Sequence, residues 1–316
     1  MQFRPLGKTG LSIAPLVFGG NVFGWTADEK TSFDLLDAFT DAGFNAIDTA
    51  DVYSSWVPGN KGGESETIIG KWLKRTGVAR DKVVIITKVG SDMGQGRRDL
   101  RKSWILEEVE ASLKRLQTDH IDLYLSHWPD DATPYEETLE AHASLVAAGK
   151  VRAFGASNLD ANQLQASFDA ADKAGLPRYG VLQPEYNLYD RDGFEGALAD
   201  LCRKEDIGVI TYFSLASGFL TGKYRSKADT EGTARGEAVQ RYLDDKGQRI
   251  LAALDQVAAE TGAKPAEIAL AWLMAKPAVT APIASATGLS QLASLTKAAS
   301  LSLSADQVAL LDRAGA

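Results

Sequence analysis

Short apolar runs rich in β-branched residues alternate along the chain with longer amphipathic stretches. This alternation is typical of parallel strands joined by helical crossovers. The runs with strand character are 16–19, 44–48, 83–88, 121–127, 151–157, 180–183, 208–212 and 279–283. The stretches with helical character are 27–42, 64–76, 103–117, 135–148, 160–174, 192–205, 248–275 and 289–299. Gly43, Gly149 and Gly175 follow three of these stretches, as glycines that end helices do.

Eight strand-then-helix units follow one another without a break in composition, which predicts one α/β domain over residues 1–316. The predicted fold is a (β/α)8 TIM barrel with extended loops on its C-terminal face. The segment 3–16, FRPLGKTGLSIAPL, predicts a β-hairpin ahead of the first barrel strand. Residues 218–246 form the longest irregular region, and a long loop in a compact domain is usually functional or mobile.

Composition narrows the classes of function. The chain of 316 residues is 45% hydrophobic and 24% charged, as globular proteins are. It has neither an apolar run of the roughly 20 residues that span a bilayer nor the apolar core of a signal peptide, so we expect no membrane association and a cytoplasmic location. The single cysteine, Cys202, and the lack of a Cys/His cluster predict no metal site, and a net charge of −8 argues against a nucleic-acid partner.

A dinucleotide site of the doubly wound type would show G-x-G-x-x-G after the first strand, and this motif is absent. The segment GQGRRD at 94–99 lacks the third glycine, and GFLTGK at 218–223 has the wrong spacing for a phosphate-binding P-loop. If a nucleotide binds, another arrangement must hold it.

Ionisable residues stand at the ends of three consecutive predicted strands. Asp48 ends the second, Lys88 the third and His127 the fourth, while Tyr53 lies on the loop after Asp48. Each residue alone has an ordinary structural explanation, because strand ends are commonly polar. In a barrel, however, the C-terminal strand ends meet at one face, where catalytic side chains are found. The joint arrival of these four residues therefore predicts a reactive site.

The chemistry of the four residues is complementary. A tyrosine has a pKa of about 10, which is high for proton transfer near neutrality, and a nearby ammonium lowers it. Lys88 is expected to supply that charge, and Asp48 to pair with Lys88 and keep it protonated. A neutral His127 would donate a hydrogen bond to a carbonyl oxygen. The set predicts a site that protonates an oxygen.

These residues also carry a family resemblance that extends over nearly the whole chain. FNAIDTADVY at 44–53 with GGESETIIGKWL at 62–73, TK at 87–88 and LYLSHWPD at 123–130 resemble the Asp, Tyr, Lys and His segments of the aldo-keto reductases. The resemblance implies a (β/α)8 barrel and the reversible, nicotinamide-dependent reduction of aldehydes and ketones. It makes Tyr53 the general acid and base, with Asp48, Lys88 and His127 in supporting roles.

Further segments resemble the family's cofactor groove: GASN at 155–158, QPEYN at 183–187 and TYFSLASGFLTGKY at 211–224. The resemblance implies that Ser157, Asn158 and Gln183 bind the nicotinamide carboxamide and that Tyr212 stacks on the nicotinamide ring. It also implies that residues 213–218 wrap the pyrophosphate and that Lys223 assists them. The residues it assigns to the cofactor are Gly20, Asn21, Asp48, Ser157, Asn158, Gln183, Tyr212, Phe213, Ser214, Leu215, Ser217, Gly218, Lys223, Ser285, Thr287 and Gln291.

The chain departs from the family pattern after the last strand. Family members often carry Lys or Arg there, against the adenosine 2′-phosphate, whereas IASATGLSQL at 283–292 has Ser285, Thr287, Ser290 and Gln291. Hydroxyls and amides can bind phosphate but lack the charge-assisted contribution. Because most of the family prefers NADP(H), we expect NADP(H), with NAD(H) or the use of both left open.

Aromatic residues in loops after the first, second and fourth strands are candidates for the wall of a substrate pocket, with loop packing as the alternative. They are Phe23, Trp25, Trp56 and Trp128. Trp72, Trp104 and Trp272 fall within predicted helices and are expected to pack. The expected partner is a small aldehyde or ketone, and neither its identity nor the oligomeric state follows from the sequence.

Two other functions stay open. The family resembles channel-associated β subunits, so the chain could be a nicotinamide-binding regulatory subunit without catalysis. A lysine at a barrel strand end could also form a Schiff base, which would make Lys88 the nucleophile of a lyase. A complete set of Asp48, Tyr53, Lys88 and His127 favours the reductase.

Overall fold

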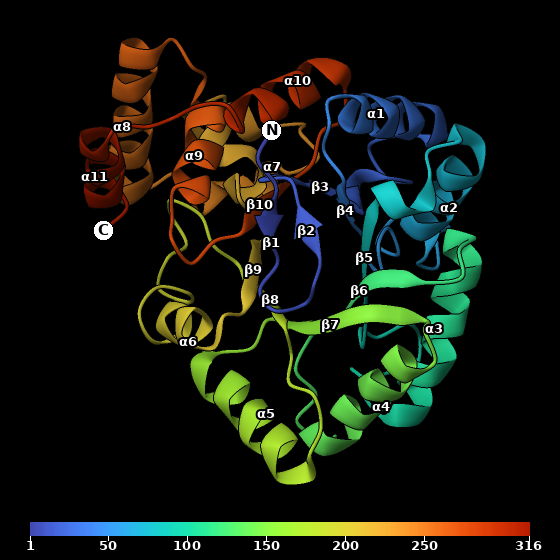
Figure 1. The fold of residues 1–316 in the computed structure, drawn as a ribbon. Coiled ribbons are helices and arrows are strands. Elements are labelled where there is room, and N and C mark those ends of the chain that lie inside the picture. Colours follow the sequence, from blue (N-terminus) through green and yellow to red (C-terminus); the bar gives the residue numbers. More distant parts are fainter.

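The computed structural model describes residues 1–316, and its centre is a closed barrel of eight parallel strands (Figure 1). Around the barrel the strand order is β10-β3-β4-β5-β6-β7-β8-β9. The strands are β3 (Val17–Gly19), β4 (Ala46–Asp48), β5 (Val84–Val89), β6 (Ile121–Ser126), β7 (Val151–Ser157), β8 (Val181–Gln183), β9 (Gly208–Thr211) and β10 (Ala281–Ala284). The predicted (β/α)8 barrel is confirmed.

Helices surround the barrel, and they carry the apolar stripes that cover its outer face. They are α1 (Glu29–Asp41), α2 (Glu64–Thr76), α3 (Lys102–Leu116), α4 (Tyr135–Ala147), α5 (Ala161–Ala174), α6 (Ala197–Glu205), α7 (Gly236–Gln240), α8 (Asp245–Thr261), α9 (Pro265–Met274), α10 (Leu289–Ala298) and α11 (Ala305–Ala314). Gly43, Gly149 and Gly175 have positive φ angles at helix ends, as predicted. None of the helices is long and apolar enough to cross a bilayer.

The predicted helix over 248–275 is wrong as a single element. The chain leaves α8 at Gly262, whose φ of +69° is left-handed, and α9 restarts with Pro265 in its first turn. Apolar periodicity continues across this break because both helices bury one face against the same core. The sequence analysis also missed α11, which Ser304 and Gln307 begin with a capping box, and α7, which lies inside the predicted loop 218–246. In Figure 1, α11 lies beside α8 at the edge of the molecule.

A predicted hairpin precedes the barrel and closes its N-terminal end. Strands β1 (Arg4–Pro5) and β2 (Ser12–Ile13) pair antiparallel, and Figure 1 shows them crossing the end of the barrel that faces the viewer. Leu6, Leu11 and Ile13 belong to the same apolar cluster as the barrel interior. Gly7 is required in the turn, because its φ is +54° and a Cβ would lie 2.5 Å from the backbone nitrogen of Gly208.

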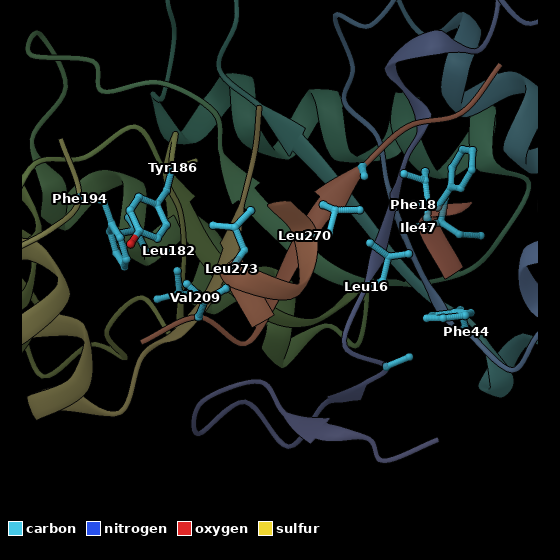
Figure 2. Packing of buried hydrophobic residues seen from close by; sticks show 14 of the residues in the cluster. Leu16, Phe18, Phe44, Ile47, Leu182, Tyr186, Phe194, Val209, Leu270 and Leu273 are labelled. Atoms are coloured by element: carbon cyan, nitrogen blue, oxygen red, sulfur yellow. The ribbon is translucent and has the colours of Figure 1, made fainter. Parts of the chain in front are cut away.

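Side chains alternate between the two faces of each barrel strand, and the outward set packs under the helices. Figure 2 shows Phe18, Ile47, Leu182 and Val209 from four strands, with Leu270 of α9 among them. All five are fully buried and belong to one large cluster between barrel and helices. This layer packs the barrel strands against the surrounding helices.

The inward set fills the barrel with apolar side chains and then changes to polar ones at the C-terminal end. Its apolar members include Val17, Ala46, Val84, Ile86, Leu123, Leu125, Ala153, Val181, Ile210, Ala281 and Ile283. The next inward positions, two residues further along, include Asp48, Lys88, His127, Gln183, Tyr212 and Ser285. The period-2 alternation that builds the core thus aims one residue from each of these strands into the same mouth.

Candidate active site

Lys88 lies at the centre of the polar cluster at this mouth. Its Nζ lies 2.8 Å from Oδ2 of Asp48, 2.8 Å from the carbonyl oxygen of Thr49 and 2.9 Å from the Tyr53 hydroxyl. The side chain has no exposed surface. Three acceptors for three N–H donors fix the direction of the ammonium, so Asp48 and Tyr53 are held next to each other against one cation.

The Tyr53 hydroxyl completes a triangle with this pair, because it also lies 3.3 Å from Oδ2 of Asp48. Burial raises the pKa of Tyr53 well above its usual value near 10, and the Asp48 charge adds to this. Sequence reasoning expected Lys88 to lower this pKa. The expectation was wrong in direction, because it left out the desolvation of a phenolate in a buried site beside a carboxylate. The phenol therefore keeps its proton at neutral pH.

The pKa of Lys88 is lowered by burial, and the neighbouring Asp48 carboxylate acts in the opposite direction. Asp48 thus favours the ammonium, as the sequence predicted, but burial outweighs it. Because water does not reach Lys88, its ammonium form depends on the hydrogen bonds to Asp48, Thr49 and Tyr53.

His127 borders the same mouth, with its ring centroid 6.1 Å from that of Tyr53. Nδ1 lies 3.0 Å from the hydroxyl oxygen of Ser91, and the Trp128 ring stacks on the imidazole. Burial lowers the pKa of His127 well below 6.5, and the Lys88 charge lowers it further. The imidazole is therefore neutral at physiological pH.

A second set of hydrogen bonds joins this cluster to strands β7 to β9. Nε2 of Gln183 donates to Oδ1 of Asp48 at 2.8 Å, and the Ser157 hydroxyl donates to the Gln183 carbonyl oxygen at 2.7 Å. The Tyr212 hydroxyl donates to Oδ1 of Asn158 at 2.6 Å, and Nδ2 of Asn158 donates to the His127 carbonyl oxygen at 2.8 Å. Residues that are distant in sequence therefore form one connected polar wall.

This wall borders a cavity of about 1050 Å³, large enough for a dinucleotide together with a small substrate. Its lining includes Tyr53, His127 and Trp128 and also Thr287, Ser290 and Gln291. The segment after β9 borders the same cavity, and in it Phe213, Ala216, Ser217 and Gly218 have positive φ angles. Successive backbone N–H groups in such turns form concave sites for anions such as phosphates.

The aldo/keto reductase family model matches residues 15–316 of the chain. The chain belongs to the aldo/keto reductase family. This is a family of oxidoreductases that use nicotinamide cofactors, and the residues lining the cavity fit such a group.

Three related sequences align with this chain over most of their lengths. The chain is 36% identical to the uncharacterized oxidoreductase YrpG of Bacillus subtilis, over 99% of this chain and 95% of the relative. It is 34% identical to the aldo-keto reductase YhdN of the same organism, over 94% and 88%. It is also 35% identical to a probable voltage-gated potassium channel subunit beta of Arabidopsis thaliana, over 94% and 91%.

Most of the residues that the sequence assigned to the cofactor line the cavity. They are Asn21, Asp48, Ser157, Asn158, Gln183, Tyr212, Phe213, Ser214, Leu215, Ser217, Gly218, Lys223, Ser285, Thr287 and Gln291. Gly20 is an exception, because it is buried behind the wall and its carbonyl oxygen accepts a hydrogen bond from Ser65. Lys88 is likewise covered, and its hydrogen bonds to Tyr53 and Asp48 connect it to the lining of the cavity.

The four aromatic candidates for the substrate pocket separate into two groups. Trp56 and Trp128 line the cavity, and Trp56 is 48% exposed. Phe23 does not reach the cavity, because it is fully buried and stacks on Phe18. Trp25 lies behind Trp56 in an edge-to-face contact at 5.8 Å. Their positions in loops gave no sign of this difference, which depends on the path of the chain after β3.

Ser91, Arg235 and Lys264 are among the cavity residues that the sequence did not single out. Arg235 comes from the irregular region before α7, and its guanidinium lies over the Trp25 ring, 5.5 Å from the centroid. Lys264 directly precedes α9. Arg235 and Lys264 belong to loops that reach the mouth only through tertiary folding, whereas Ser91 lies two residues after the end of β5.

Thr49 and Asp51 follow Asp48 in the chain and are fully buried. The Thr49 hydroxyl donates to Ser65, and Oδ1 of Asp51 accepts from the backbone of Val52. Oδ2 of Asp51 is buried without a partner, and burial raises the pKa of this carboxyl well above its usual value. Burial therefore favours the protonated, neutral form of Asp51.

Proposed function

We propose that this aldo/keto reductase reduces an aldehyde or ketone to an alcohol, reversibly, with Tyr53 as the acid and base. The observation that carries the proposal is the position of the Tyr53 hydroxyl. It lies 2.9 Å from the Lys88 ammonium, and Tyr53 lines the same cavity as His127. A reduced nicotinamide held by Ser157, Asn158 and Gln183 would supply the hydride for the carbonyl carbon.

The chain's own contribution is the proton. Tyr53 holds it at neutral pH, as a phenol does, and burial raises the pKa further. When negative charge develops on the carbonyl oxygen, the phenolic proton moves to it and the O–H bond of Tyr53 breaks. Lys88 then stabilises the phenolate by the hydrogen bond it already donates, and Asp48 keeps Lys88 in place. In the reverse reaction the phenolate takes the proton from the alcohol.

His127 acts on the carbonyl oxygen as a neutral hydrogen-bond donor. A cationic imidazole would place a second positive charge near Lys88, and burial together with Lys88 disfavours that form. Trp56 and Trp128 border the space next to Tyr53 and give the carbonyl's substituents an apolar wall. This arrangement suits a carbonyl with an apolar or aromatic substituent.

For the cofactor we propose NADP(H) in preference to NAD(H). The segment 283–292 has no cation, but Lys223, Arg235 and Lys264 line the same cavity from other segments. The side chain of Arg235 has no carboxylate partner, and burial lowers its pKa. A guanidinium in that position gains most from an anionic ligand such as a phosphate.

The direct test is to follow oxidation of NADPH and of NADH in parallel with a panel of aliphatic and aromatic aldehydes, ketones and keto-sugars. The proposal predicts carbonyl-dependent oxidation, faster with NADPH at low cofactor concentration. Tight binding of both reduced cofactors without oxidation by any carbonyl would instead favour the regulatory subunit, a role that the channel subunit beta of Arabidopsis thaliana carries in its name.

The geometry also bears on the Schiff-base alternative. A nucleophilic lysine needs a neutral amine with a free lone pair, whereas Lys88 donates to three acceptors and does not line the cavity. We therefore propose the reductase over the lyase. Trapping of an imine at Lys88 by borohydride in the presence of a carbonyl would reverse this choice.

A further inference from the structure

The hydrogen bond between Ser91 and His127 determines which nitrogen of the imidazole carries the proton. A neutral imidazole has one N–H donor and one acceptor nitrogen, and the partner of one nitrogen sets the state of the other. The Ser91 hydroxyl oxygen lies 3.0 Å from Nδ1 of His127, and both residues are buried. The proposed orientation of the carbonyl by His127 works only if the proton lies on Nε2.

The two arrangements differ in how well they satisfy Ser91. If Nδ1 carries the proton, the Ser91 oxygen accepts it, and the hydroxyl proton is left without any protein acceptor, because Nδ1 is the only side-chain partner of this oxygen. If Nδ1 is the acceptor, the hydroxyl donates to it and both groups are satisfied. Leaving a buried polar group without a partner is costly, so the second arrangement is favoured.

The other ring nitrogen, Nε2, is free for a ligand. It makes no hydrogen bond to the protein, yet it is not among the polar atoms that are buried without a partner. Because His127 lines the cavity, Nε2 is reached from there. In the arrangement with Nδ1 as acceptor, the one donor of the imidazole therefore points to the space where a substrate oxygen would bind.

Ser91 is held rigidly in this position. Gly90 before it has a φ of +106°, and a Cβ there would lie 2.5 Å from Cδ2 of Leu100, so the chain needs glycine to turn at the end of β5. The Ser91 carbonyl oxygen accepts a hydrogen bond from Gln95 at 2.8 Å. On the other side, Trp128 stacks on the imidazole and limits its rotation.

We propose that Ser91 is a positioning residue that donates a hydrogen bond to Nδ1 of His127 and so keeps the proton on Nε2, where it serves the carbonyl oxygen. The expected effect of Ser91 on the rate of reduction rests on the proposed reductase function, whereas the assignment of the proton to Nε2 does not. Burial and the charges of Lys88 and Arg98 keep the imidazole neutral without choosing between its two nitrogens, and the Tyr53 ring, which also faces it, stays uncharged.

The test is nuclear magnetic resonance of the whole chain labelled with nitrogen-15 in histidine. The chain has three histidines, so the signals are few, and a His127→Gln variant identifies those of His127. In a neutral imidazole the unprotonated nitrogen resonates far from the protonated one. We expect Nε2 to be protonated in the wild type and in Ser91→Thr, and Ser91→Ala to shift both nitrogen signals toward the average of the two forms.

The chain supplies a matched control in a second serine and histidine pair outside the cavity. The Ser126 hydroxyl oxygen lies 3.0 Å from Nε2 of His142, a buried residue whose pKa burial lowers to about 3. Ser126→Ala should change the signals of His142 and leave the protonation of His127 as it is. Ser91→Ala should do the reverse.

A kinetic measurement then separates positioning from a general structural effect. Ser91→Ala should lower kcat/KM for carbonyl reduction about tenfold with an unchanged Kd for the reduced cofactor, and Ser91→Thr should restore most of it. A wild-type His127 protonated on Nδ1, or a Ser91→Ala variant whose His127 keeps the wild-type signals, overturns the inference even if the enzyme is active. If Ser91→Ala does not fold, the wild-type and Ser91→Thr spectra still decide. Absence of carbonyl reduction in a wild type that is protonated on Nε2 would instead contradict the proposed function alone.

Discussion

The Lys88 ammonium lies 2.8 Å from the Asp48 carboxylate, and solvent reaches almost no part of either side chain. Asp48 is on β4 and Lys88 on the neighbouring β5, where Asp48 is opposite Ile86. Ile86 and Lys88 are successive inward-facing residues of β5, so Lys88 comes directly after the partner of Asp48 on that face. The strand register therefore brings the two charges together before any loop is placed.

The first prediction concerns the stability that depends on this pair. Lys88→Met removes the cation and leaves the Asp48 charge buried without its partner, which should lower the free energy of unfolding by about 3–5 kcal/mol. Urea denaturation followed by circular dichroism measures the loss. Lys88→Met with Asp48→Asn should lose clearly less than the two single losses combined. Additive losses would show that the pair does not interact.

The second prediction concerns Asp51 and pH. Burial raises the pKa of this carboxyl above its usual value near 3.8, so the native chain holds a proton that the unfolded chain releases. The resulting stabilisation is complete below about pH 4 and is lost as the pH rises through the raised pKa. Asp51→Asn, which needs no proton, should therefore be more stable than the wild type at pH 7, on the order of 1 kcal/mol, and should lose this advantage near pH 4.

Thermal unfolding at a series of pH values measures this difference. The exposed residue Asp131 provides the control, because Asp131→Asn should show no comparable trend. An Asp51→Asn variant whose advantage grows as the pH falls would contradict the assignment of a neutral Asp51.

The third prediction concerns the choice of cofactor. Lys264 lines the cavity with Ser290 and Gln291, where the N-terminus of α9 packs beside α10, and Glu267 of α9 accepts a hydrogen bond from Ser294 there. If this end holds the adenosine 2′-phosphate, Lys264→Gln should raise the KM for NADPH about tenfold and leave the KM for NADH unchanged. Initial rates with both cofactors measure this. Lys227→Gln, in an exposed turn, is the control, and equal effects on both cofactors in Lys264→Gln would contradict the placement.

Much of the barrel could be predicted because strand periodicity is local. The same two-residue period that buries Ala46 and Ile86 places Asp48 and Lys88 at the mouth, so a sequence pattern was enough to find them. The division of 248–275 into α8 and α9 was missed, although Gly262 and Pro265 are visible in the sequence, because the apolar face continues across them.

The rest of the site depends on where loops go. Arg235 is a single basic residue in an irregular region, and only the fold shows that its guanidinium lies over Trp25 at the cavity. Phe23 was assigned to the pocket because it follows β3, but the chain turns there and buries the ring against Phe18. The pKa of Tyr53 was also misjudged, since the sequence reveals its charged neighbours but not its desolvation.

The central claim is that Tyr53 supplies the proton when the carbonyl is reduced. The most direct measurement is single-turnover oxidation of bound NADPH by a carbonyl that the wild type reduces, compared in Tyr53→Phe and in Tyr135→Phe, a control on α4. The account predicts a fall of about 10²–10⁴-fold in the rate for Tyr53→Phe, an unchanged Kd for NADPH and a wild-type rate for the control. A Tyr53→Phe enzyme that oxidises NADPH at the wild-type rate would contradict it.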